Sequence, residues 1–381
     1  MVYKRGPEDI PLADGVNGTK RPRIDSAAPK NELSTPTRQQ PTLTQQERYK
    51  LAQWLDKKAE SDVDMFKITY PGGAGKGKKA PRPKGERLLL DGREYGEVAF
   101  TVANKQKWEQ LTKYRRCTVT EQTFGIGDCV FVRGDEETKS DTKGDDDTLT
   151  QWKAQIHEVR ALDENHVYLR VSWLYRPSRD LPGGVKPYHG TYELIPSTDM
   201  TIIDAKTIDG SLNVKYWDEY KDDDVHGSGE YFWRQAYDHL SGTLSSCRTI
   251  CKCAQPQNPD LQIVQCSSCN EWQHARCLET EVLDKYLTDH PGESNGTTVN
   301  GASHPKLKGK KNGQTKVPMI EKSEVDGVTA AIKTDDNGKD NVRIVILDSR
   351  GEQAITEEHE SPCLLCGKAL DAEGGQVAVK Q

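Results

Sequence analysis

Eight residues in the last third of the chain have the types and the spacing of zinc ligands. The order is C-x-C, twelve residues, C-x2-C, four residues, H-x2-C, 85 residues and C-x2-C. Zinc prefers thiolate and imidazole ligands in sets of four, and a structural site is closed by four protein ligands. The pattern therefore suffices for two structural zinc ions and leaves no open coordination position for catalysis. The ligands are Cys251, Cys253, Cys266, Cys269, His274, Cys277, Cys363 and Cys366.

The position of the histidine separates two classes of zinc finger. In a RING finger it would normally be the fourth ligand, whereas His274 is the fifth. This order resembles the PHD finger. In the interleaved topology of that family, one zinc is held by Cys251, Cys253, His274 and Cys277, and the other by Cys266, Cys269, Cys363 and Cys366.

Two features depart from this pattern or leave an alternative open. The separation between Cys277 and Cys363 is longer than is usual in PHD fingers, but the entropy of loop closure grows only logarithmically with length. A disordered insert is therefore compatible with the site. Cys247 forms a C-x3-C with Cys251 and offers a competing set of ligands.

Trp272 stands two residues before His274. It occupies the place of a cage tryptophan in methyl-lysine-reading PHD fingers, where a methylammonium binds the indole face by cation–π attraction. No other aromatic residue lies between Cys253 and Trp272, so the cage would be incomplete. A contact with a histone tail and a purely structural role both remain open for Trp272.

Composition predicts a partly disordered chain with a basic arm. Of the 381 residues, 34% are hydrophobic, and a low apolar content is typical of chains with segments that cannot offset their conformational entropy by burial. Residues 1–90 carry 18 Lys/Arg against 11 Asp/Glu, although the net charge of the chain is -6. No run long and apolar enough for a membrane helix and no secretory signal are present in the sequence, which favours a reducing compartment.

The first part of the chain is expected to hold a disordered basic arm at 1–44, followed by a short helix and a basic linker at 45–94. Lys20–Arg23 is either a nuclear import signal or part of an ordinary charged tail. Thr44 can cap an amphipathic helix that ends near Glu60. The linker, Gly72–Lys84, lacks the GxxxxGK[ST] order of a phosphate-binding loop and is expected to attract phosphates nonspecifically.

Residues 95–245 read as a mainly β domain, because short apolar runs alternate with turn residues. We expect a barrel-like sheet with a C-terminal helix at Glu230–Leu240, and a solvated acidic loop at Asp141–Asp147. The zinc module then occupies 247–381. It is expected to contain a disordered insert at about 290–340 and a strand at Val342–Leu347.

Residues 95–245 resemble a bromo-adjacent homology (BAH) domain in Phe124–Val132, Trp152–Val159 and Val167–Pro177, and the similarity continues through Tyr192–Gly210. With the PHD-type finger, the chain resembles the small BAH–PHD proteins of fungi and plants. The resemblance implies recognition of methylated histone tails in repressed chromatin. In that group the BAH domain reads the Polycomb mark at lysine twenty-seven of histone H3.

The resemblance also implies a methyl-lysine cage formed by Trp152, Trp173 and Tyr175. Trp173 and Tyr175 are two apart, so they point to the same face of a strand. Spacing alone favours ordinary core aromatics on the face of Val171. Methyl-reading relatives commonly carry a His and an Asp just after the following Glu-Leu segment, where this chain has Asp199 and Thr201.

These patterns together predict a non-enzymatic nuclear chromatin reader that contributes to repression. The expected partners are the histone H3 tail, nucleosomal DNA bound weakly through the basic linkers, and a corepressor complex, with no role for a membrane. Two other readings are a RING-like ubiquitin ligase and a non-reading scaffold subunit of a silencing complex.

Overall fold

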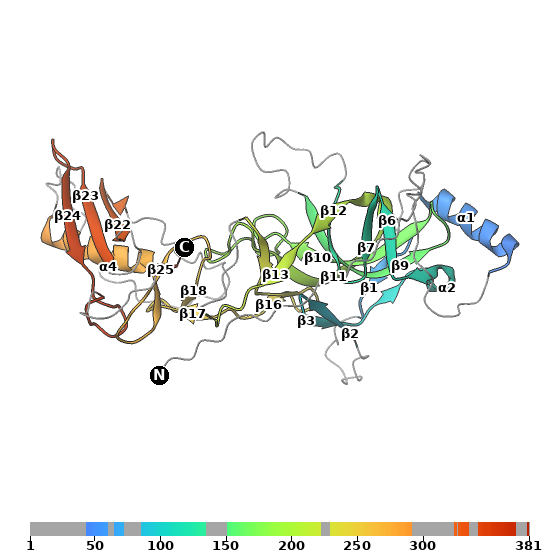
Figure 1. Ribbon diagram of the computed structural model, residues 1–381, viewed down its shortest axis with the longest axis horizontal. Helices are drawn as coiled ribbons and strands as arrows, with labels where there is room; N and C mark the ends of the chain where they lie inside the picture. Colours follow the sequence, from blue (N-terminus) through green and yellow to red (C-terminus); the bar gives the residue numbers. More distant parts are fainter. Residues whose placement is uncertain are drawn as a thin grey trace, which may run out of the picture.

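The computed structural model describes residues 43–59, 65–71, 85–134, 151–221, 229–291, 324–325, 327–334, 342–370 and 379–380. They form an elongated molecule of two parts (Figure 1). The β-rich body comprises the described residues from 43 to 245, and the cysteine-rich module those from 247 onward. The predicted import signal, the basic linker and the acidic loop lie outside the described residues, as do nearly all of the basic arm and much of the insert.

Three long neighbouring strands form the centre of the β-rich body: β9 (Trp152–Ala161), β10 (Val167–Tyr175) and β11 (Ile195–Asp204). Strand β10 pairs antiparallel with both others and is buried on both faces, with Leu169 in one hydrophobic cluster and Leu174 in another. Within the described chain these strands belong to an eight-stranded sheet in the order β12-β8-β9-β10-β11-β15-β16, with β5 paired to β9. The remaining strands are β5 (Thr112–Tyr114), β8 (Cys129–Val132), β12 (Ile208–Leu212), β15 (Tyr237–Asp238) and β16 (Thr243–Leu244).

The pairing of β10 with β11 is interrupted at Trp173. Ser172 pairs with Met200 and Leu174 pairs with Pro196, so three residues of β11 lie opposite one residue of β10. At this irregularity β11 turns from β10 towards β15, and Ser197 pairs with Tyr237. The extra residues bend the strand and change the direction of the side chains beside Trp173.

The N-terminal helix α1 (Gln45–Ala59) is present where the sequence predicted it. Thr44 and Glu47 form a capping box, with the Glu47 N–H donating to Thr44 Oγ1 at 3.3 Å and the Thr44 N–H donating to Glu47 Oε2 at 2.8 Å. Leu51 and Leu55 are buried in a cluster with Phe66 and Tyr168 of the β-rich body. The helix is therefore an integral part of the body.

The β-rich body also begins earlier than the predicted boundary at residue 95. Strand β2 (Glu86–Leu90) falls within the segment 45–94, which was predicted to hold only the short helix and the linker. It forms a hairpin with β3 (Arg93–Val98), whose Val98 packs with Leu88. The shorter elements around them are β1 (Ile68–Thr69), β4 (Thr101–Val102), α2 (Lys105–Gln110), β6 (Arg116–Val119), β7 (Gln122–Gly125) and the 3-10 turn η2 (Ala205–Thr207).

The helix predicted at Glu230–Leu240 is wrong. Strand β14 (Tyr231–Trp233) pairs in parallel with β13 (Val214–Tyr216), and β15 follows it. Phe232 and Trp233 are buried as expected, but Leu240 is 53% exposed. Aromatic residues favour strands, and the pairing with β13 decides the local structure against the helical spacing.

The cysteine-rich module combines a small finger with a two-layer unit of helix and sheet. Helix α4 (Ala275–Asp289) packs on a sheet of order β21-β22-β23-β24, at the opposite end of the molecule from α1 (Figure 1). The predicted strand at Val342–Leu347 is confirmed as β23. The strands of the module are β17 (Thr249–Ile250), β18 (Gln255–Pro256), β19 (Ile263–Gln265), β20 (Trp272–His274), β21 (Glu324–Val325), β22 (Val328–Thr334), β23 (Val342–Asp348), β24 (Ile355–Glu360) and β25 (Val379–Lys380).

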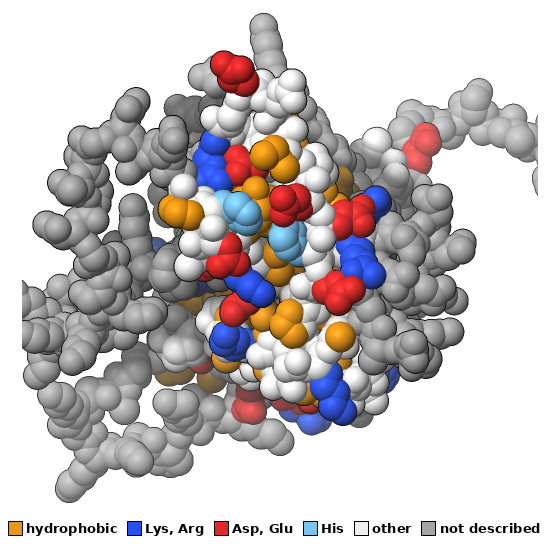
Figure 2. All heavy atoms as spheres, turned by 90° about the vertical axis from the view of Figure 1, so that its left-hand side faces the viewer, with side chains coloured by type: hydrophobic (Ala, Val, Ile, Leu, Met, Phe, Trp, Pro, Cys, Tyr) orange, Lys and Arg blue, Asp and Glu red, His pale blue; other side chains and the backbone are white. Residues whose placement is uncertain are grey.

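The predicted disordered insert at about 290–340 is wrong for its last part. Strand β22 pairs along its whole length with β23, and Val328 and Ala330 are buried against Leu278 and Leu283 of α4. The face of the module seen end-on carries hydrophobic side chains scattered among acidic and basic ones (Figure 2). Ion pairs of the module include Lys333 with Glu358 at 2.9 Å.

Hydrogen bonds join the two parts of the molecule. The Asp260 carboxylate accepts hydrogen bonds from the Thr191 N–H at 2.7 Å and from the Thr191 hydroxyl at 2.8 Å. The Asn258 amide donates to the carbonyl of Pro187 at 2.8 Å. A polar loop of the module is thus fixed on a turn of the β-rich body.

Candidate functional site

The first predicted ligand set is assembled by three elements of the cysteine-rich module. Cys251 and Cys253 follow β17, His274 ends β20, and Cys277 lies in the first turn of α4, with all four ligand atoms within 4.8 Å of one another. Cys251 adopts a φ of 65°, which turns the chain sharply enough for both thiols to face the histidine. The hydrogen bond with Cys277 lowers the pKa of Cys251, which favours the thiolate that a metal requires.

The geometry of His274 fits a metal ligand. Its Nδ1 lies 3.3 Å from the sulfur of Cys253 and 3.9 Å from that of Cys277, while its Nε2 lies 3.2 Å from the carbonyl of Pro256. A proton on Nε2 donates to this carbonyl, which leaves Nδ1 free to bind a metal and fixes the orientation of the ring.

The second predicted ligand set joins the two ends of the module. Cys266 and Cys269 come from the turn after β19, and Cys363 and Cys366 from the turn after β24; the sulfurs of Cys266 and Cys366 are 3.8 Å apart. Burial opposes ionisation of Cys363, but the N–H groups of Cys366 and Leu365 outweigh it and lower the pKa of this thiol to about 7.

The same backbone turn explains the C-x2-C spacing at both ends of this second set. The carbonyl of Cys266 accepts from the N–H of Asn270 at 2.7 Å, and the carbonyl of Cys363 accepts from the N–H of Gly367 at 2.9 Å. Asn270 and Gly367 both have positive φ, at 58° and 75°. Two such turns facing each other present four sulfurs to one point.

The competing ligand Cys247 is not part of either set. It lies beside Arg234 and the carboxylates of Glu219 and Glu193, and burial raises its pKa to about 12. Both sets consist of the ligands that the PHD resemblance implied. Each set offers four sulfur or nitrogen donors, as a closed structural zinc site requires. These groups are able to hold two metal ions.

Trp272 is buried within the finger. Its side chain is 3% exposed and packs with Ile250, Ile263 and Cys251, while its carbonyl accepts from the Cys251 N–H at 3.0 Å. This burial favours the structural role that the sequence left open beside a contact with a histone tail.

The predicted cage residues lie together at one end of β9 and β10. Trp152, at the start of β9, contacts Trp173 with ring centroids 5.3 Å apart and planes at 59°. Trp173 also packs against the cluster that contains Tyr175, and Tyr175 in turn contacts Tyr237 at 5.7 Å. Both indoles are half-buried, whereas Tyr175 is 7% exposed and forms a buried side of the cluster.

Polar side chains of β11 hold two of these rings. The Trp173 indole N–H donates to Thr201 Oγ1 at 3.0 Å, and the Tyr175 hydroxyl donates to Asp199 Oδ2 at 2.9 Å. Burial raises the pKa of Tyr175, so the phenol stays protonated and remains a donor. Asp199 and Thr201 are the positions at which relatives are expected to grip a peptide; here each of them bonds a ring of the cluster.

Trp152 is held by a buried ion pair. The Arg176 guanidinium lies 4.9 Å from the centre of the Trp152 ring and bonds Asp180 at 2.6 and 2.7 Å. It also donates to the carbonyl of Gln151 at 3.0 Å, and the Lys153 ammonium donates to the same carbonyl at 3.1 Å. Two cations therefore fix the backbone next to Trp152.

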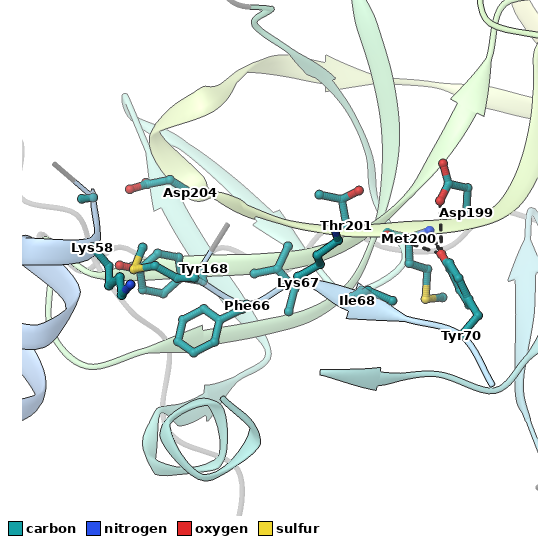
Figure 3. Close-up of a pocket in the computed structure, with 13 residues that line it drawn as sticks. Lys58, Phe66, Lys67, Ile68, Tyr70, Tyr168, Asp199, Met200, Thr201 and Asp204 are labelled. Carbon is teal, nitrogen blue, oxygen red and sulfur yellow. Dashed lines mark hydrogen bonds between the residues drawn. The ribbon is translucent and has the colours of Figure 1, made fainter. Parts of the chain in front are cut away.

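A groove lies beside the cluster on the other side of β11 (Figure 3). It encloses about 440 Å³ between β11, the segment 65–71 and the end of α1. At one end the Tyr70 hydroxyl donates to Asp199 Oδ1 at 3.1 Å and accepts from the Met200 N–H at 2.6 Å. Asp199 is thereby shared between Tyr70 of the groove and Tyr175 of the cluster.

Sequence reasoning missed Tyr70, Tyr237, Arg176 and Asp180. Tyr70 is 129 residues from Asp199, and no periodicity connects the two. The Arg176 and Asp180 pair, at a separation of four residues, is the one signal that could have been found, because it directly follows the predicted strand.

Two plant proteins are similar in sequence to this chain. No family model matches the chain. The chromatin remodeling protein EBS of Arabidopsis thaliana is 30% identical over 173 residues, which are 45% of this chain and 69% of that protein. The chromatin remodeling protein SHL of the same plant is 29% identical over 188 residues, 48% of this chain and 76% of that protein.

One solved structure, the BAH domain of yeast Rsc2, aligns with 35% of this chain and 54% of its own at 14% identity and a TM-score of 0.25, which is too low to support an argument. In the described part of the chain, none of the helices has the length and apolar character of a membrane span. The similarity to EBS and SHL shows that the chain belongs to the BAH–PHD family of chromatin proteins.

Proposed function

We propose that this protein is a non-enzymatic nuclear reader that binds a trimethylated lysine of the histone H3 tail in the cage of Trp152, Trp173 and Tyr175. The lysine is the Polycomb mark at position twenty-seven, and binding contributes to transcriptional repression. The observation that supports the proposal is the contact between Trp152 and Trp173 at 5.3 Å beside a tyrosine, at an end of the sheet where both indoles are half-buried.

The chemistry of the cluster suits a trimethylammonium group. Such a group cannot donate a hydrogen bond, so aromatic faces select it by cation–π and apolar contact. Arg176 covers one face of Trp152, and the ligand binds the remaining exposed parts of the two indoles. Because Thr201, Asp199 and Arg176 already fix the rings, little side-chain entropy is lost on binding.

We also propose that the two ligand sets hold structural zinc. Thiolate and imidazole donors suit this ion, and all eight ligands come from the chain itself. The expected content is two zinc ions per chain, measured by elemental analysis of the purified protein.

Calorimetric titration of the full chain with H3 peptides, unmethylated and trimethylated at lysine twenty-seven, tests the proposal. Trimethylation is expected to create binding, and Trp173→Ala to weaken it by at least about thirtyfold, because one desolvated cation–π contact contributes about 2 kcal/mol. Tyr49→Ala, which removes a ring that is 64% exposed on α1, is the matched control and should bind like the unchanged protein.

Other results would favour the two competing functions. Ubiquitin transfer without any methyl-dependent binding would support a RING-like ligase. Binding of the unmethylated and the methylated peptide with equal affinity, unaffected by Trp173→Ala, would support a scaffold. Zinc content and circular dichroism of each variant separate a loss of binding from a loss of fold.

A further inference from the structure

Two basic stretches of the chain meet at the end of the β-rich body that lies away from the cysteine-rich module (Figure 1). One is residues 43–59, which include α1, and the other is residues 105–116, which run from α2 through β5 to the start of β6. Leu51 of α1 and Trp108 of α2 share a hydrophobic cluster that holds the two stretches together. Together they carry nine Lys/Arg against three Asp/Glu, although the net charge of the whole chain is -6. This end of the molecule is therefore locally positive.

Trp54 of α1 lies at the centre of the positive charge. Lys50 and Lys58 are one turn before and one turn after it on the helix. Lys57, three residues after Trp54, lies on the same face. From α2, the Lys107 ammonium lies over the Trp54 ring at 4.4 Å from its centre, which is a cation–π contact. Four lysines from two elements thus border a single tryptophan.

The three carboxylates of these stretches have other roles. Glu47 caps the start of α1 by accepting from the Thr44 N–H at 2.8 Å. Asp56 is two residues from Trp54 and therefore on the other side of the helix, where its carboxylate lies 3.0 Å from His166 Nε2. Glu109 pairs with Lys105 at 3.7 Å. The lysines that border Trp54 therefore keep a net positive charge.

The positive charge continues along the chain beyond α2. Strand β5 extends over about 10 Å and leads to Arg115 and Arg116, which are both exposed. Lys113 of this strand pairs with Glu158 at 2.8 Å, so its charge is offset within the body. We call the set of Lys50, Lys57, Lys58, Lys107 and Arg115 the basic surface. It extends over a helix and the start of a hairpin and does not converge on one point, as a site for a small anion would.

The dimensions of the basic surface suit duplex DNA. Lys50 and Lys58 are about 12 Å apart along α1 at the usual rise of a helix, a length of duplex that carries about seven phosphate charges. Proteins that bind single strands without sequence preference offer aromatic rings on which the bases stack. Trp54 instead contacts Lys107 and Phe66, the latter with ring centroids 5.9 Å apart. The ring therefore positions a lysine and is not free to stack on a base.

We propose that the basic surface binds the phosphate backbone of duplex DNA. The chain belongs to a family of chromatin proteins, so DNA is the polyanion that such a surface meets. Phosphate contacts carry no sequence information, and binding is therefore expected to be independent of the DNA sequence. The basic surface shares no residue with the cage, so this inference does not depend on the reading of a methylated lysine.

Fluorescence anisotropy of two labelled duplexes of unrelated sequence, titrated with the zinc-loaded full chain, tests the inference. A variant that combines Lys50→Gln, Lys57→Gln and Lys107→Gln should bind both duplexes at least about tenfold more weakly at about 0.1 M salt. The slope of log affinity against log salt should become shallower by about two to three, because each lost phosphate contact removes about 0.9. Lys50→Gln with Lys57→Gln, which leaves Lys107 on Trp54, should make the slope shallower by about two with the fold unchanged in circular dichroism.

The matched control removes the same charge elsewhere. Lys215→Gln, Lys252→Gln and Lys333→Gln, combined in one variant, change lysines whose side chains are 53%, 62% and 61% exposed. This control should bind both duplexes within about twofold of the unchanged protein, since its lysines lie outside the basic surface. Equal weakening in the control and in the variants of the basic surface would show that net charge alone decides binding, and would overturn the inference.

Two further results would also overturn it. Residues 72–84 carry five Lys/Arg and no Asp/Glu, so a variant with Lys76→Gln, Lys78→Gln and Lys79→Gln tests whether the linker supplies the contacts. Loss of DNA binding in this variant, with full binding in the variants of the basic surface, would assign the contacts to the linker. Binding to vesicles of phosphatidylserine and phosphatidylcholine, without binding to either duplex, would identify a lipid surface instead.

Discussion

Replacing Arg176 with methionine would remove a buried charge while keeping most of the apolar stem that lies on Trp152. The side chains of Arg176 and Asp180 are 8% and 5% exposed, and the guanidinium bonds both carboxylate oxygens. Breaking such a pair leaves a buried charge without its partner and costs about 3–5 kcal/mol. We expect Arg176→Met to lower the free energy of unfolding by about 3 kcal/mol. This value is at the low end of that range because methionine keeps most of the apolar part of the arginine side chain.

A double-mutant cycle separates the pair from its surroundings. Asp180→Asn removes the negative charge with little change in shape and is expected to cost about 2–3 kcal/mol, since Arg176 stays partly satisfied by the Gln151 carbonyl. The double variant should cost less than the sum of the two, with a coupling energy of at least about 1.5 kcal/mol. Urea denaturation of the four proteins in zinc-saturated buffer, followed by tryptophan fluorescence, measures each free energy.

The cycle also connects stability to the cage. Because Arg176 fixes both the Trp152 ring and the preceding carbonyl, Arg176→Met should weaken binding of the trimethylated peptide about tenfold even where the variant is fully folded. Additive costs, with coupling below about 0.5 kcal/mol, would refute the reasoning about the pair. Unchanged peptide affinity in Arg176→Met would refute its role in holding Trp152.

Three further outcomes are expected. Thr201→Val removes the acceptor of the Trp173 indole and should weaken peptide binding about fivefold in calorimetry, with the fold intact, because one neutral hydrogen bond contributes about 1 kcal/mol. Cys366→Ser should lower the zinc content from two ions to one and expose the core between α4 and β22 to amide exchange, while the first ligand set stays loaded. Burial, aided by the charge of Arg170, lowers the pKa of His157 from 6.5 to about 3. Between these two values only the unfolded chain binds the proton, so the free energy of unfolding should fall as the pH drops below 6.5. His157→Asn should therefore flatten the dependence of the melting temperature on pH between about 6.5 and about 4.5.

The sequence was sufficient to predict the two ligand sets because metal chemistry restricts both residue type and spacing. Each C-x2-C reports a local turn, visible in the positive φ of Asn270 and Gly367. The grouping of the sets across the chain came from the PHD resemblance. The sequence predicted β23 in the long separation between Cys277 and Cys363, but not helix α4 or strand β22. The pairing of β22 with β23 is a tertiary contact that leaves little signal in the local sequence.

The sequence predicted the mainly β class of the body and its central strands. It predicted the first and last elements of the body less well. The helix expected at Glu230–Leu240 failed because Phe232 and Trp233, which a helix would bury on one face with Ala236 and Leu240, are buried by a short strand instead. Helix α1 was found because Thr44 is a suitable cap before an amphipathic stretch, and the structure adds Glu47 as its partner in the cap. The residues that Leu55 of this helix contacts could not be predicted, since they lie in distant parts of the sequence.

The cage was predicted as a set of residues, and the structure adds the means by which they are held. Trp173 and Tyr175 could be placed together from strand periodicity. The irregular pairing opposite Trp173 places Asp199 within hydrogen-bonding distance of Tyr175. It could not be predicted from the regular alternation of side chains along a strand.

The carbonyl of Gln151, which accepts from both Arg176 and Lys153, has a consequence for engineering. Trp152 is anchored by Arg176, which follows it in the chain, and by its pairing with Val132 of β8, which precedes it. Both anchors lie outside residues 135–150, so a fluorescent reporter can be inserted there, because lengthening a connection costs little in closure entropy. Such an insertion would report on ligand at the two indoles from within the same strand connection, without altering the chemistry of either ring.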